Sequence, residues 1–238
     1  MPTMIEAVST TFAVPMSRSE PIPRRACFIV PDRSSPVAPV GDFAVAHAEP
    51  LARLLSLLGC GEEAACLSFD RLQRMHPAAR GALGSIAQDE RHHDALLRGL
   101  LARLPGPGPE TLALAAMRRI HTELGCSDPG LQLAAIVALD SALCLLLSQL
   151  LRRGSAVAMC APLRNSLSRI RSDEARHVAV ARAIALSDGR RRQLRDVAAK
   201  LRADLAAALV LAADDLELLG FDPDRMLPAI GRLPSGLL

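Results

Sequence analysis

The sequence predicts an all-α protein built around a bundle of four long helices. Half of its 238 residues are hydrophobic, yet only 2% are aromatic, and Trp and Tyr do not occur. A core of Leu, Ala, Val and Ile with so few aromatic residues is typical of helices rather than sheets. Clusters of proline and glycine divide the chain into apolar segments of helical length. At this length we expect one domain with a sizeable core.

The N-terminal half is expected to hold an arm followed by the first two bundle helices. Residues 1–42 are rich in Pro, Ser and Arg and lack sustained periodicity, which is typical of an irregular arm. Gly59 and Gly61 punctuate the apolar pattern that follows. The expected segments are therefore the arm at 1–42 and a bundle domain at 43–238, which begins with a short helix at 43–58, a helix at 62–75, and a helix from Pro77 to about 104.

The C-terminal half is expected to hold two further bundle helices. The sequence PGPGP at 105–109 is a strong break, and a connecting helix at 110–125 follows it. The remaining expected helices lie at about 131–152, from Pro162 to about 186, and at about 190–219, before a short tail. The long connection between the second and third bundle helices predicts two helical hairpins joined by a crossover.

The two predicted hairpins look like copies of one another. Residues 62–74 read EEAACLSFDRLQR and residues 140–152 read DSALCLLLSQLLR, which aligns Glu62 with Asp140. In the partner helices, LGSIAQDERHH at 83–93 matches LSRIRSDEARH at 167–177. Each hairpin therefore carries an upstream carboxylate and a downstream Asp-Glu-x-x-His motif, and such internal repeats are informative about architecture.

The register of each hairpin brings these groups to one level. Residues at equal distance from the turn of an antiparallel hairpin face each other, and the midpoint of 62 and 90 is 76, at the predicted turn. The midpoint of 140 and 174 is 157, inside the second predicted loop. A Glu and a His three residues apart project from one helix face. All these side chains are thus expected to meet at one depth in the bundle.

This set matches the ligands of a dinuclear carboxylate site, in which two helices give one carboxylate each and two give Glu-x-x-His. Carboxylate oxygens are hard donors, and imidazole suits iron. Four buried carboxylates would be very costly without cations. The candidate metal ligands are Glu62, Glu90, His93, Asp140, Glu174 and His177. A polar core of buried ion pairs without metal is the alternative, but carboxylates outnumber the plausible cations there.

On these residues the chain resembles the ferritin-like diiron carboxylate superfamily, which includes rubrerythrins, ribonucleotide reductase small subunits, acyl-carrier-protein desaturases and diiron N-oxygenases. The resemblance covers about residues 60–186 and rests on two Asp-Glu-x-x-His motifs in register. It implies a ferritin-like four-helix bundle with a crossover connection plus extra N- and C-terminal helices. It also implies two iron ions, or a manganese–iron pair, with O₂ as co-substrate.

The resemblance also implies a role for each residue. Glu90 and Glu174 would bridge the two ions, while Glu62 and Asp140 would be terminal ligands. We assign Glu90, Glu174 and Asp140 to the catalytic centre. Asp173 would orient His93, and Asp89 would orient His177, by hydrogen bonds behind the ligands. The chain departs from the family in two ways: aspartate replaces the more usual glutamate at 140, and the absence of Tyr excludes a tyrosyl radical.

Several neighbouring residues have competing interpretations. Glu63 competes with Glu62, but positions three, four and seven after Glu62 form an apolar face, which favours Glu62. Cys66 and Cys144 each follow a terminal carboxylate by four residues; they either pack as small core residues or line a cavity beside the metals. His121 is either a surface or capping residue or, less expectedly, an extra ligand or cavity residue.

Charge, cysteine spacing and hydropathy exclude several protein classes. The formal net charge of +3 is too small and too dispersed for nucleic-acid binding. The six cysteines form no CxxC pair and suit free thiols in a reducing cytoplasm. We identify no signal peptide. Residues 131–151 are apolar enough to suggest a membrane span, but Asp140 in their middle favours a buried helix, so no membrane partner is expected.

The leading hypothesis is a cytoplasmic diiron oxygenase or oxidase that hydroxylates, desaturates or N-oxygenates a small, mostly apolar organic substrate. No nucleotide-binding motif occurs, so an external electron donor such as a reductase or ferredoxin is expected. A homodimer is compatible with this interpretation. The alternatives are a ferritin-like ferroxidase or iron-handling protein, and a non-catalytic helical partner protein with a relict site.

Overall fold

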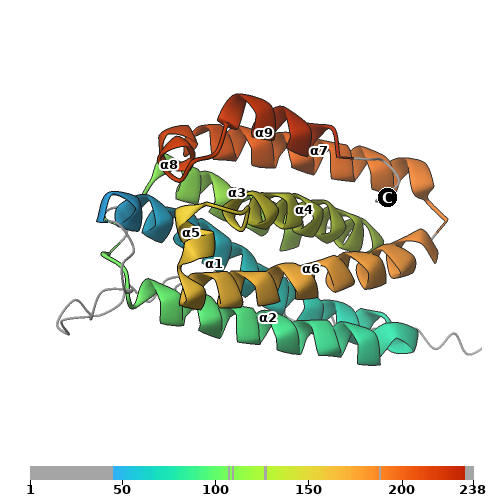
Figure 1. Ribbon diagram of the computed structural model, residues 1–238. Helices are drawn as coiled ribbons and strands as arrows, with labels where there is room; N and C mark the ends of the chain where they lie inside the picture. Colours follow the sequence, from blue (N-terminus) through green and yellow to red (C-terminus); the bar gives the residue numbers. More distant parts are fainter. Residues whose placement is uncertain (1–44, 107, 109, 126–127, 188, 234–238) are drawn as a thin grey trace, which may run out of the picture.

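The computed structural model describes residues 45–106, 108, 110–125, 128–187 and 189–233 (Figure 1). The irregular arm predicted at 1–42 lies outside these residues. Every regular element within them is helical, and none is a strand, so the predicted all-α class is confirmed. The helices lie roughly side by side, which is the arrangement of a helical bundle (Figure 1).

Two helical hairpins form the centre of the molecule. Helix α1 packs against α2, and α4 packs against α6, while α2 contacts α6 and α1 contacts α4. The connection between the hairpins contains α3, which packs on α1. The four central helices are α1 (Val45–Met75), α2 (Arg80–Leu101), α4 (Pro129–Leu150) and α6 (Ala161–Ser187), and the connecting helix is α3 (Leu112–Gly125). This is the predicted pair of hairpins with a crossover.

The predicted break between 43–58 and 62–75 is wrong, because α1 runs through both segments. Gly59 and Gly61 remain within the helix, where each costs only about 1 kcal/mol relative to alanine. Leu57 and Glu62 are buried on either side of these glycines, and Cys60 is buried between them. Packing of one continuous face therefore outweighs the local preference for a break.

The C-terminal region also differs from the predicted single helix at 190–219. It forms α7 (Arg191–Val210) and α8 (Ala213–Leu218), followed by α9 (Pro223–Gly231) in the predicted tail. Asp214 and Asp215 lie in the first turn of α8, where acidic side chains are favourable, and this explains a new helix start. Two other short elements, η1 (Pro77–Ala79) and α5 (Ala156–Met159), lie in the connections of the two hairpins.

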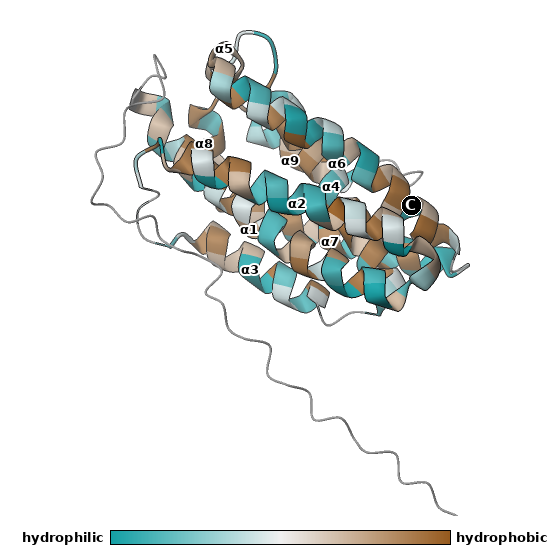
Figure 2. Cartoon of the chain, turned by 90° about the horizontal axis from the view of Figure 1, so that it is seen from below, coloured by the Kyte–Doolittle hydropathy of each residue, from teal (hydrophilic) through white to brown (hydrophobic). Residues whose placement is uncertain are grey.

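Helices α3 and α7 form a second layer over α1 and α4. Helix α7 packs on α4, α3 packs on α1, and the two covering helices contact each other. Among the described residues, Pro129–Leu150 is the one helix long and apolar enough to cross a membrane, and 72% of its most apolar window is buried inside the protein. This burial is that of a core helix packed inside the bundle. Hydrophilic residues gather instead along outward parts of α2 and α6 (Figure 2).

Candidate metal centre

Six polar side chains lie on the buried faces of the four central helices. They are Glu62, Glu90, His93, Asp140, Glu174 and His177, with exposed fractions between 0% and 7%. On α2, Glu90 and His93 continue the buried stripe of Ile86 and Leu97, because residues three, four and seven apart share one helix face. The same periodicity places Glu174 and His177 on the buried stripe of α6.

Four of these side chains converge on one point. Glu62, Glu90, His93 and Glu174 each offer a donor atom, and these atoms all lie within 4.8 Å of one another. His93 Nδ1 lies 3.1 Å from Glu174 Oε1 and 3.3 Å from Glu62 Oε2. Glu90 Oε2 lies 3.5 Å from the same nitrogen. This buried cluster can hold a metal ion.

The second histidine approaches the same glutamates from the other side. His177 Nδ1 lies 3.0 Å from Glu90 Oε1 and 3.6 Å from Glu174 Oε1. The two imidazole rings are 5.7 Å apart between centroids. Glu90 and Glu174 therefore each lie near both histidines, which is the placement needed for carboxylates that bridge two ions.

The outer nitrogen of each histidine faces an aspartate from the other hairpin. His93 Nε2 lies 3.2 Å from Asp173 Oδ2, and His177 Nε2 lies 3.4 Å from Asp89 Oδ2. These are the pairings that the resemblance implies. Arg176 donates a hydrogen bond to both aspartates, at 2.8 Å to Asp89 and 3.2 Å to Asp173. The Nδ1 atoms are thereby directed inward and the Nε2 atoms outward, a polarity that suits metal binding through Nδ1.

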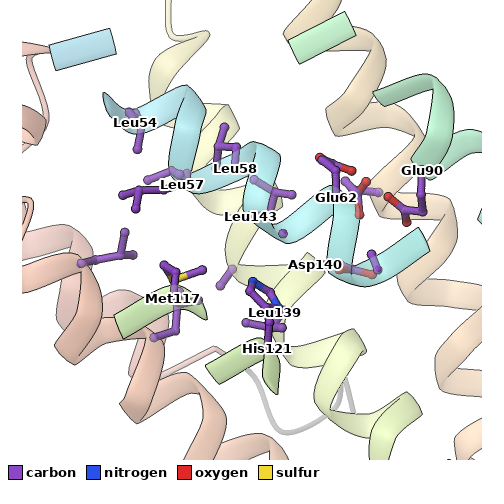
Figure 3. Close-up of a pocket in the computed structure, with 17 residues that line it drawn as sticks. Leu54, Leu57, Leu58, Glu62, Glu90, Met117, His121, Leu139, Asp140 and Leu143 are labelled. Atoms are coloured by element: carbon purple, nitrogen blue, oxygen red, sulfur yellow. The ribbon is translucent and has the colours of Figure 1, made fainter. Parts of the chain in front are cut away.

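Asp140 is buried but stands slightly aside from this cluster. It is 7% exposed and does not belong to the four converging residues. Its Oδ2 atom has no hydrogen-bond partner among the described residues. The negative charges of Glu174 and Glu90 act on it, so it shares their surroundings. Figure 3 shows its carboxylate on the same side of the cavity as Glu62 and Glu90.

The charges of the cluster perturb one another strongly. Burial, together with the charges of Glu90 and Glu174, raises the pKa of Glu62 and of Asp140 well above the usual range. Burial opposes the ionised form of Glu90 as well, but the two histidines lower its pKa to about 2. Burial disfavours protonated His177, yet contacts with Glu174 and Glu90 raise its pKa to about 10. Protons on the histidines thus offset part of the carboxylate charge.

The donor set is compatible with a dinuclear metal site. Two buried carboxylate oxygens, Glu62 Oε1 and Asp140 Oδ2, have no hydrogen-bond partner among the described residues. Among those residues, no lysine or arginine forms an ion pair with the four carboxylates. Four carboxylates with two histidines match the charge and the donor types of a pair of divalent ions.

Glu63 lies away from this cluster. Its side chain is half-buried, and the charges that act on it belong to Asp94, Arg98 and Arg118 rather than to the histidines. Glu62, by contrast, contacts His93 at 3.3 Å. Of the two neighbours, only Glu62 is placed to ligate a metal.

A cavity opens beside the cluster, and the cysteines do not line it. Its walls come from α1, α3, α4 and α7, and it reaches Glu62, Glu90, Asp140 and Glu174 at one end (Figure 3). Of the two interpretations of Cys66 and Cys144, as core residues or as cavity-lining residues, the second does not apply to this cavity. Cys66 lies near Arg91, and Cys144 donates to the Arg171 carbonyl at 3.9 Å. Both thiols face the partner helix of their own hairpin rather than the covering layer.

The cavity also contains residues that the sequence did not single out. Leu54, Leu57 and Leu58 come from the segment expected to be a separate helix, and Leu205 and Leu209 come from α7. His121 on α3 lines the cavity as well, which selects the less expected of its two interpretations.

The chain matches no model of a protein family, no curated protein and no solved structure.

Proposed function

We propose that the protein is a dinuclear iron oxidoreductase that uses O₂ to oxidise a small, mostly apolar organic molecule. The observation that carries this proposal is the cavity, because apolar walls lead directly to the buried carboxylates. A site that only oxidised ferrous ions would need a polar path to the metals. An aliphatic cavity suits an organic substrate and excludes water from it.

Each residue of the cluster has a proposed role in holding the ions. Glu62 and His93 would hold one ion, Asp140 and His177 the other, and Glu90 with Glu174 would bridge them. The bound ions would supply the binding and reduction of O₂. Asp89 and Asp173 keep the histidines oriented from behind. An external reductase or ferredoxin would deliver the electrons, and the same donors also accept a manganese–iron pair.

The test combines metal analysis with turnover. Protein reconstituted anaerobically with ferrous iron is expected to bind about two ions per chain. It is then exposed to O₂ with and without aliphatic candidate substrates, and O₂ consumption and oxidised products are measured. One ion or none would contradict the dinuclear centre. Iron uptake far above two per chain, without organic product, would favour the iron-handling alternative.

A further inference from the structure

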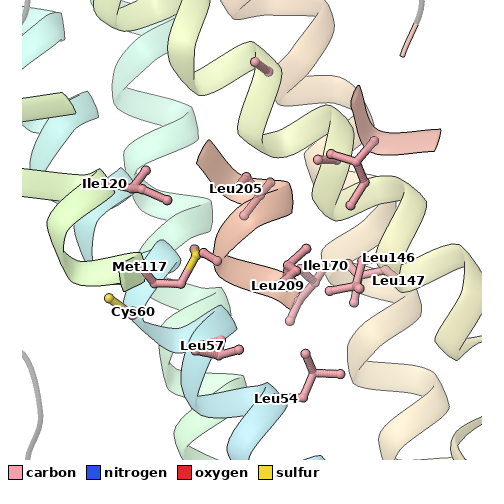
Figure 4. Packing of buried hydrophobic residues seen from close by; sticks show 14 of the residues in the cluster. Leu54, Leu57, Cys60, Met117, Ile120, Leu146, Leu147, Ile170, Leu205 and Leu209 are labelled. Carbon is pink, nitrogen blue, oxygen red and sulfur yellow. The ribbon is translucent and has the colours of Figure 1, made fainter. Parts of the chain in front are cut away.

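The cavity beside the cluster is aliphatic along most of its length. Beyond the carboxylates its walls are formed by leucine side chains of α1, α4 and α7 and by Met117 of α3 (Figures 3 and 4). Leu54 and Glu62 both line it and are eight residues apart on α1, which corresponds to about 12 Å along the helix axis. This length and lining suit an extended aliphatic chain.

One polar side chain away from the carboxylates interrupts these apolar walls. His121 lies on the same face of α3 as Met117 and lines the cavity. Neither Nδ1 nor Nε2 has a hydrogen-bond partner among the described residues, although both atoms are buried. Buried polar atoms are nearly always hydrogen-bonded, so an orphaned imidazole facing a cavity indicates a missing partner.

The backbone of α1 leaves room for this imidazole next to the metal ligands. A side-chain carbon added at Gly61 would lie 3.8 Å from His121 Nε2, in ordinary contact. Gly61 directly precedes Glu62, so the imidazole lies at the cluster end of the cavity rather than at the Leu54 end. Figure 3 shows the ring among the side chains that line the cavity.

We propose that His121 is a substrate-positioning residue, which hydrogen-bonds the single polar group of a neutral aliphatic molecule while the chain of that molecule lies along α1 toward Leu54. This inference rests on the proposed function, because it assigns a substrate class to the same site. In this arrangement His121 holds the polar group of the substrate beside the carboxylates and histidines of the cluster, and the apolar end of the substrate lies away from them.

Two features select a neutral polar group. Burial lowers the pKa of His121 to about 4, so the imidazole is uncharged near neutral pH and offers one donor and one acceptor nitrogen. No lysine or arginine is among the residues that line the cavity, so no side chain there provides a counter-charge for an anionic head group. A hydroxyl or primary amide, which both donates and accepts, matches the neutral imidazole.

The test compares short ligands that differ only in their polar group. Binding of 1-hexanol, hexanamide, hexanoate and 1-chlorohexane is measured by competition against a fluorescent apolar probe, with and without bound metal ions. We expect the alcohol and the amide to bind more tightly than hexanoate. His121→Phe should weaken the alcohol and the amide by about 2- to 10-fold, the value of one hydrogen bond, and leave 1-chlorohexane unchanged.

Two further variants complete the design. His121→Gln restores a donor and an acceptor and should recover part of the lost affinity, and it also serves if His121→Phe does not fold. His92→Phe changes an exposed histidine of α2 and should leave all affinities unchanged.

Three results would overturn the proposal: unchanged alcohol affinity in His121→Phe, tightest binding of hexanoate, or loss of one metal ion in His121→Phe with normal alcohol binding. The last result would make His121 a metal ligand. Because binding is measured without turnover, the two proposals fail separately. Alcohol binding that depends on His121 in a protein that consumes no O₂ would leave this inference standing and remove the proposed function.

Discussion

The α1–α2 hairpin holds its upstream carboxylate against its histidine, whereas the α4–α6 hairpin does not. Glu62 Oε2 lies 3.3 Å from His93 Nδ1, but among the described residues no ion pair joins Asp140 to His177. The two halves are otherwise alike, since each histidine contacts both central glutamates and one aspartate of the opposite hairpin. The difference therefore arises from the upstream carboxylate.

This difference leaves the two halves with upstream carboxylates of unequal reach. Aspartate is one methylene shorter than glutamate, and Asp140 Oδ2 remains without a hydrogen-bond partner among the described residues while its side chain lines the cavity. A metal ion in that half would keep an open position, which metal catalysis requires. The internal repeat thus provides the ligands, and its imperfection provides the asymmetry.

The largest effect is expected where the two halves share a ligand. Glu90→Ala or Glu174→Ala should reduce bound iron from about two ions per chain to less than one, because each glutamate lies near both histidines. Elemental analysis after reconstitution measures this, and O₂ consumption should disappear with the metal. Retention of both ions in either variant would show that the shared glutamates are not bridging ligands.

The next effect should be confined to one half. Glu62→Ala removes the terminal carboxylate beside His93 and should weaken binding of one ion by at least about 10-fold while the other ion stays bound. Glu63→Ala is the matched control, because it changes the neighbouring glutamate of α1 outside the cluster. Isothermal titration calorimetry with the metal ion measures the affinity of each site and distinguishes the two variants. A stronger effect from Glu63→Ala would reverse the assignment.

The motifs and their register could be predicted because they follow from local geometry. Glu90 with His93, and Glu174 with His177, share a face through 3.6-residue periodicity, and equal distance from a turn places each motif level with its carboxylate. The cavity could not be predicted, because its walls come from packing between distant segments. Leu205 of α7 and His121 of α3 meet the α1 face only after the second layer forms.

Replacement of the aspartates behind the histidines should weaken metal binding to a similar extent in both halves. Asp173→Asn and Asp89→Asn each weaken the group that orients one Nε2 atom, and about 10- to 100-fold loss of metal affinity is expected for either variant. Metal affinity is measured by competition with a chelator. A large effect for one variant and none for the other would show that the hairpins differ in their outer contacts as well.

The pH dependence of stability should change when metal ions are bound. His177 has a pKa raised to about 10, so its stabilising effect without metal is complete below about pH 6.5 and is lost as the pH rises toward 10. The raised pKa values of Glu62 and Asp140 act in the same direction. The unfolding midpoint of the metal-free protein should therefore fall between pH 6.5 and 9.

Bound divalent ions replace these protons, so the loaded protein should not share that fall, and its metal affinity should increase with pH. Circular dichroism melts of both forms across the same buffers measure the effect. If the unfolding midpoints of the two forms changed with pH in the same way, the cluster would not be the cause of the pH dependence.

The smallest effect should come from making the two halves alike. Asp140→Glu restores the residue that stands at the matching position of the first hairpin. The longer side chain can reach the second ion and fill its open position, so two ions should remain bound while turnover of an organic substrate falls several-fold. The measurement is product formation at matched iron occupancy, with Glu63→Asp as a control that alters carboxylate length outside the cluster. Unchanged turnover would remove the proposed role of Asp140, because the asymmetry between the halves would then have no effect on catalysis.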